Sequence, residues 1–97
     1  MPAYIIVDLE VKDAAAIQDY ARNVAPIIRK HGGEYLAVSD GTRTLEGNWR
    51  PHRIVLIRFP NLQAIDAFIS DPEYAPWKAL RLRASEGSMI ALEGLQG

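Results

Sequence analysis

Tyr4-Ile5-Ile6-Val7-Asp8-Leu9-Glu10-Val11 is the stretch of sequence that decides the fold. In an extended chain successive side chains point to opposite faces, so this segment has one wholly aliphatic side: Ile5, Val7, Leu9 and Val11. The other side mixes apolar and acidic residues: Tyr4, Ile6, Asp8 and Glu10. The segment is therefore predicted to be a strand whose aliphatic face needs a layer of helices to cover it.

The next segment has the signals of an amphipathic helix. Asp13 is a suitable N-cap, and Gly32-Gly33 is a suitable stop. The residues between them that keep the i, i+3, i+4, i+7 spacing are Ile17, Tyr20, Ala21, Val24, Ile27, Ile28 and His31. Pro26 within this segment predicts a kink.

Two more strands and a second helix follow. Glu34 to Ser39 alternates and ends at the Asp40-Gly41 turn, after which Thr42 to Glu46 leads into a polar loop. Arg53 to Phe59 is the most apolar segment and is predicted to be a central strand. Pro60-Asn61 then opens a helix with four residues inward, and Asp71-Pro72 closes it; the inward residues are Leu62, Ile65, Phe68 and Ile69.

The C-terminal part adds a turn with a helical stretch over Pro72 to Ala84, interrupted near Pro76, and a last strand over Ser88 to Glu93. The order βαββαβ predicts an α+β fold, a ferredoxin-like sandwich in one domain spanning 1–97. Both helices then cover one face of four antiparallel strands. The opposite face stays bare and partly apolar, so a homodimer is expected in which a second copy covers it.

Composition and charge exclude several functional classes. Eleven basic and 12 acidic residues give a formal charge of −1, which provides no basic patch for nucleic acid or an anionic membrane. The absence of cysteine excludes disulfides and thiolate catalysis. The two histidines, His31 and His52, lack metal-ligand spacing, so neither a metal nor another cofactor is expected. No signal sequence or membrane span is recognised at the N-terminus, which favours the cytoplasm.

The loop Leu45-Glu46-Gly47-Asn48-Trp49-Arg50-Pro51-His52-Arg53 contains one large aromatic among turn-forming and polar residues. An indole in such surroundings is poorly placed to be ordinary core. Trp49 is therefore expected either to dock against a neighbouring subunit or to line a ligand pocket.

With this architecture, the chain resembles the family called domain of unknown function 1330, within the dimeric α/β-barrel superfamily that also holds small cofactor-free monooxygenases. The resemblance covers essentially the whole chain. The segments that carry it are 4–11, 32–33, 45–51, 53–60, 71–74, Arg81 and 93–94. Arg58 and Ile69 depart from it, since an acid and an aromatic are common there. The resemblance implies a homodimer whose two sheets form a barrel, and it implies no established reaction.

Several side chains have both a functional and a structural interpretation. Arg53 and Arg81 can each hold a ligand carboxylate with a planar fork, or form a surface salt bridge. Tyr74 and Trp77, with the other aromatics, can enclose an apolar cavity between helices and sheet, or simply pack. His31 suits the C-terminal end of its helix and is a weaker catalytic candidate.

Two acidic residues of the first predicted strand are the last candidate residues. Asp8 and Glu10 share one strand face, where they can act as paired carboxylates, face solvent or pair with Arg58.

The favoured function is binding of a small, partly apolar metabolite by Trp49, Arg53, Tyr74, Trp77 and Arg81. The alternatives are a cofactor-independent monooxygenase or isomerase using His31, Trp49 or Tyr74, and a structural or interaction module without a ligand.

Overall fold

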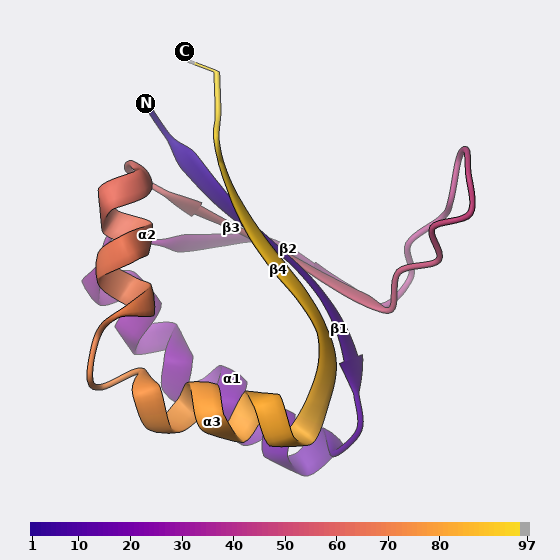
Figure 1. The fold of residues 1–97 in the computed structure, drawn as a ribbon, viewed down its shortest axis with the longest axis horizontal. Coiled ribbons are helices and arrows are strands. Elements are labelled where there is room, and N and C mark those ends of the chain that lie inside the picture. The colour runs from indigo at the N-terminus through magenta and orange to yellow at the C-terminus, as the bar shows by residue number, and fades with distance from the viewer. Residues whose placement is uncertain (96–97) are drawn as a thin grey trace.

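A computed structural model describes residues 1–95, which form a four-stranded antiparallel sheet and three helices. The elements in chain order are β1 (Ala3–Val11), α1 (Ala14–Lys30), β2 (Glu34–Ser39), β3 (Arg53–Phe59), α2 (Leu62–Ile69), α3 (Ala75–Ala84) and β4 (Ser85–Glu93). The strand order β2-β3-β1-β4 is that of a ferredoxin-like sandwich, as predicted. In Figure 1 the helices lie on the concave side of the curved sheet, and the loop between β2 and β3 projects away from them.

The two faces of the sheet differ as the alternation in β1 requires. The aliphatic face is the inner one, where Ile5, Val7 and Leu9 are at most 5% exposed beneath the helices. On the outer face, Ile6 lies between Leu56 of β3 and Ile90 of β4, and Leu56 in turn pairs with Ala37 of β2. One continuous apolar row therefore crosses all four strands of the outer face; we call it the outer row.

The ends of α1 follow from its sequence signals. The Asp13 carboxylate accepts a hydrogen bond from the Ala16 amide at 3.1 Å, which satisfies one of the unpaired donors of the first turn. After the C-cap residue His31 the chain turns at Gly32, whose φ of +81° lies in the left-handed region that favours glycine. The helix continues through the exposed Pro26 to Lys30.

Two predicted boundaries in the C-terminal part are wrong. Pro76 does not interrupt a helix, because it is the second residue of α3, where a missing N–H group has no intrahelical partner to lose. The last strand begins at Ser85 rather than Ser88. Gly87 permits the early start: it pairs with Leu9, and a Cβ at this position would lie 1.9 Å from the Asp8 carbonyl oxygen. Gly87 therefore lets β4 lie against the end of β1.

Candidate functional site

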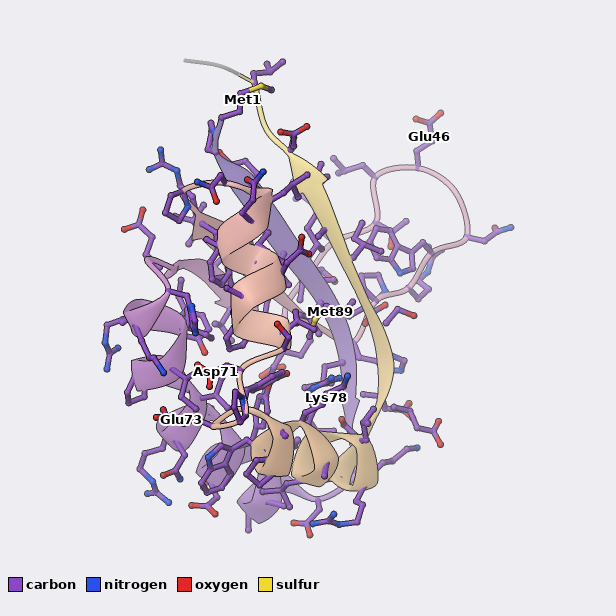
Figure 2. The ribbon with its side chains drawn as sticks, turned by 60° about the vertical axis from the view of Figure 1, so that its left-hand side comes forward. Met1, Glu46, Asp71, Glu73, Lys78 and Met89 are labelled. Carbon is purple, nitrogen blue, oxygen red and sulfur yellow. The ribbon has the colours of Figure 1, made fainter. Side chains whose placement is uncertain are left out.

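A cavity of about 290 Å³ lies between the inner face of the sheet and the helices. Its floor comes from β1 and β3, and α1 and α2 contribute apolar side chains; the principal apolar residues are Ile5, Val7, Ile17, Val55, Ile57 and Phe68. Met89 of β4 joins them from the helix-facing side of the sheet (Figure 2). The volume is at the lower end of the range of about 300–1,000 Å³ found for small-molecule pockets. The cavity thus suits a compact ligand with an apolar body.

Beside β2 the cavity reaches the molecular surface. Tyr35 and Val38 of this edge strand both line the cavity and are 38% and 59% exposed. No other strand lies on the outer side of β2 in the sheet of residues 1–95. A ligand could therefore enter past Tyr35 and Val38 without separating the strands.

Four side chains bring polar groups to this apolar lining: Tyr20, Tyr35, Arg53 and Arg81. The Tyr20 hydroxyl lies 2.9 Å from that of Tyr74. Burial, followed by the neighbouring Tyr74, raises the pKa of Tyr20, and burial raises the pKa of Tyr35. Both phenols therefore stay protonated at neutral pH and can act as hydrogen-bond donors.

The two arginines at the cavity differ in their partners. Arg53 is neutralised by Asp40, to which its Nε donates at 2.7 Å and its Nη2 at 3.3 Å. This fork-to-carboxylate pair raises the pKa of Arg53 and lowers the pKa of Asp40. Arg81 on α3 has no such partner within residues 1–95, and its buried Nε has no hydrogen-bond acceptor. Arg81 is therefore the side chain with unused binding capacity.

Tyr74 and Trp77 contribute to the packing around the cavity rather than to its lining. Tyr74 is completely buried, and its ring centroid lies 4.4 Å from that of Phe68. Trp77, on α3, is half-buried and packs against the core. Of the predicted ligand-binding residues, Arg53 and Arg81 reach the cavity directly, whereas Tyr74 reaches it through Tyr20.

His31 joins the end of α1 to the turn between α2 and α3. Its Nε2 donates to Asp71 at 2.7 Å, and Lys30 Nζ donates to the same carboxylate oxygen at 3.0 Å. The other oxygen of Asp71 accepts from the Glu73 amide at 2.9 Å. The hydrogen bond from His31, followed by those from the Glu73 amide and Lys30, holds the pKa of Asp71 well below its usual range. The arrangement is that of a structural clasp, and Figure 2 shows Asp71 and Glu73 at this turn.

Trp49 lies on the opposite side of the sheet from the cavity. It shares a shallow groove with Ile6 and Ile54 of the outer face, and it is 62% exposed. Its Nε1 donates to Asp8 at 3.0 Å, and the other oxygen of Asp8 accepts from the His52 amide at 2.9 Å. These hydrogen bonds lower the pKa of Asp8, with the His52 amide contributing most. Asp8 thereby fixes the base of the projecting loop, whose tip carries Glu46 (Figure 2).

Of the alternatives considered for Asp8 and Glu10, pairing with Arg58 is wrong. Glu10 forms an ion pair with Lys12, and His52 Nε2 lies 2.9 Å from the same carboxylate group. Arg58 instead lies opposite Glu34 in the sheet, with 3.6 Å between guanidinium and carboxylate. The alternation correctly places these residues on the outer face, but the strand register decides which of them meet.

Sequence reasoning did not single out Tyr20 and Tyr35 as binding residues. A signal was present for both, because each has a polar tip at a position that its helix or strand turns inward. Asp8 as the anchor of the Trp49 loop had no local signal, since 41 residues separate the two partners. Across residues 1–95 no group of three or more His, Cys, Asp or Glu side chains is placed to hold a metal ion.

The sequence pattern of the family called domain of unknown function 1330 matches residues 2–95, which make up the whole of this architecture. The chain belongs to the family of domain of unknown function 1330. No curated protein matches it. Within the described part of the chain, no helix is long and apolar enough to cross a membrane.

Solved structures of other proteins share the fold of this family member. A protein of unknown function from Rhodopseudomonas palustris has a TM-score of 0.80 at 19% identity, over 99% of this chain and 84% of that chain. A dimeric ferredoxin-like protein of unknown function from Jannaschia sp. CCS1 has a TM-score of 0.78 at 15% identity, over 97% of this chain and 100% of that chain. SnoaB, a cofactor-independent oxygenase from Streptomyces nogalater, has a TM-score of 0.69 at 12% identity, over 99% of this chain and 95% of that chain. At these identities the similarity establishes the fold alone.

Proposed function

We propose that this protein binds a small, partly apolar metabolite in the cavity between helices and sheet. The observation that carries the proposal is the cavity itself, with its largely apolar lining that also includes two tyrosine and two arginine side chains. The cavity leaves apolar side chains of the inner face uncovered where it opens beside β2, and removing apolar surface from water is favourable. A ligand with an apolar body would cover this surface.

A binding role is favoured over a cofactor-independent monooxygenase or isomerase. The residues that line the cavity include no carboxylate and no imidazole to move a proton. His31 is held in the clasp with Asp71, and Trp49 lies on the outer face. SnoaB is an oxygenase with the same fold, but the cavity here offers phenols and guanidinium groups, which suit recognition.

We infer further that the protein works as a homodimer that pairs through the outer row. Within this row Ile90 is 58% exposed, and its neighbour on the same face of β4, Leu92, is 42% exposed. The described chain has no helix on this side of the sheet (Figure 1). A second copy would bury the row and bring the Trp49 loop against its partner, and the Jannaschia relative is likewise described as dimeric.

Two naphthalene derivatives of matched shape test the binding proposal: naphthalene-2-carboxylate and its neutral analogue naphthalene-2-carboxamide. Isothermal titration calorimetry should detect binding of at least one of them. That ligand at ten times its Kd should stabilise the fold by about 1.4 kcal/mol and raise Tm by several degrees. Failure of both compounds to bind at millimolar concentration would contradict the proposal.

A variant at the entrance locates the binding site. Val38→Trp places a large side chain where the cavity reaches the surface beside β2, and it should weaken binding at least tenfold. Leu82→Trp is the matched control, because Leu82 is 61% exposed on α3 and does not line the cavity. Equal affinities in the two variants would place the binding site elsewhere.

A further inference from the structure

We infer that the ligand of this cavity is a monoanion with an apolar body, and that Arg81 is the residue that selects it. This inference rests on the proposed binding function and names the chemical class of the ligand. It is carried by the unpartnered Nε of Arg81 at the wall of an otherwise apolar cavity.

The charged side chains of the lining favour a negatively charged ligand. The lining contains two cationic side chains, Arg53 and Arg81, and no acidic one. Asp40 already neutralises Arg53 through two hydrogen bonds. Arginine side chains carry a positive charge in proteins, and no described carboxylate lies within ion-pair distance of Arg81.

The buried Nε of Arg81 also lacks a hydrogen-bond acceptor. A buried donor without an acceptor is unfavourable, and such groups in native proteins call for an explanation. Within residues 1–95 no carboxylate lies within ion-pair distance of Arg81. The two arginines of β3 do have such partners: Arg53 pairs with Asp40, and Arg58 pairs with Glu34. An acceptor on a ligand in the cavity would satisfy this donor.

The shape of the guanidinium favours a carboxylate or a related planar anion over a neutral acceptor. Arginine presents its donors in a rigid planar fork that matches two oxygens of a carboxylate. The protonated phenols of Tyr20 and Tyr35 also belong to the lining and add no negative charge to it. The ligand thus places its apolar body over Val7, Val55 and Ile57 and its anionic end toward Arg81.

The decisive experiment compares naphthalene-2-carboxylate with naphthalene-2-carboxamide by isothermal titration calorimetry on the wild-type protein, Arg81→Met and Arg83→Met. Methionine keeps an unbranched apolar chain and removes the donors. Arg83 is the matched control, because it is exposed two residues later on α3 and does not line the cavity. The wild type and Arg83→Met should bind the carboxylate at least about tenfold more tightly than the carboxamide, and Arg81→Met should lose that preference.

Further readouts separate this role from a structural one. Arg81→Lys should restore part of the preference, since it returns the charge without the planar fork. Removing an unsatisfied buried donor should leave Tm of ligand-free Arg81→Met equal to or above that of the wild type. A lower Tm with an intact preference for the carboxylate would show that Arg81 is structural and would overturn the inference.

The two proposals fail in different ways. If carboxylate and carboxamide bind the wild type equally, the cavity binds ligands but Arg81 does not select their charge. If neither compound binds, both the binding function and the ligand class are contradicted.

Discussion

The two faces of the sheet are built from the same strands but differ in what covers them. On the inner face, Ile5, Val7 and Leu9 of β1 are at most 5% exposed, and the helices cover an apolar cavity whose lining includes the unpaired Arg81. On the outer face, the outer row is open and the Trp49 loop projects beyond it (Figure 1). The difference suggests that the inner face recognises a small molecule, whereas the outer face recognises a second copy of the chain. Substitutions on each face can test this division.

The largest effect is expected from the inner face. Phe59 is completely buried, and its ring centroid lies 5.7 Å from that of Phe68. Phe59→Ala should lower the free energy of unfolding by about 3–5 kcal/mol, because it removes buried apolar surface and leaves a space. Urea denaturation at fixed protein concentration measures this loss. A loss below about 1 kcal/mol would show that the inner face contributes far less to stability than burial of such a ring implies.

A charge in the outer row should affect association rather than folding. Ile90→Lys should yield a monomer at micromolar concentration with an unchanged circular dichroism spectrum, because pairing would bury an unpaired ammonium group. Light scattering after size exclusion should show the wild type at about twice the chain mass of 10.8 kDa.

The control for this variant is Leu82→Lys, which makes the same kind of change at a similarly exposed residue on α3. It should remain a dimer. If the wild type is already a monomer, or if Leu82→Lys dissociates as readily as Ile90→Lys, the outer row is not the dimer interface.

A smaller effect on association is expected at Trp49. An exposed indole whose loop is fixed by Asp8 is suited to be an aromatic anchor in a partner subunit. Trp49→Ala should weaken dimerisation by about 2 kcal/mol, or about thirtyfold in Kd, and make Tm more sensitive to protein concentration. Trp49→Phe should retain more affinity. An unchanged dimer affinity in Trp49→Ala would mean that this side chain is merely exposed.

The smallest effect on stability is expected at Asp71, whose contacts with His31 and Lys30 lie outside both faces of the sheet. Its pKa is lowered in the folded protein, so its stabilising contribution is complete above the unfolded pKa near 3.8 and is lost as the pH falls below that value. Asp71→Asn should therefore reduce the urea midpoint at pH 7 and have progressively less effect as the pH falls through the acid range. A deficit that is the same at pH 7 and pH 2.5 would contradict an ionised role for Asp71.

Local patterns predicted most elements of the fold. The alternation of β1, the Asp13 cap and the Gly32 stop each depend on residues close in sequence, and each lies where it was expected. The boundaries that were wrong depend on contacts between distant segments. The early start of β4 needs Gly87 opposite Leu9, which a single segment does not reveal.

The sequence alone determined the fold class, the family and the two unequal faces of the sheet, because alternation and capping act over a few residues. It also drew attention to Arg53, Arg81 and Trp49. Only the tertiary structure separated them: Asp40 satisfies Arg53, Arg81 keeps an unpartnered donor at the cavity, and Trp49 lies on the other face. The physical reason is that the partner of a charge or an aromatic ring is set by strand register and helix packing, which bring together residues far apart in the chain.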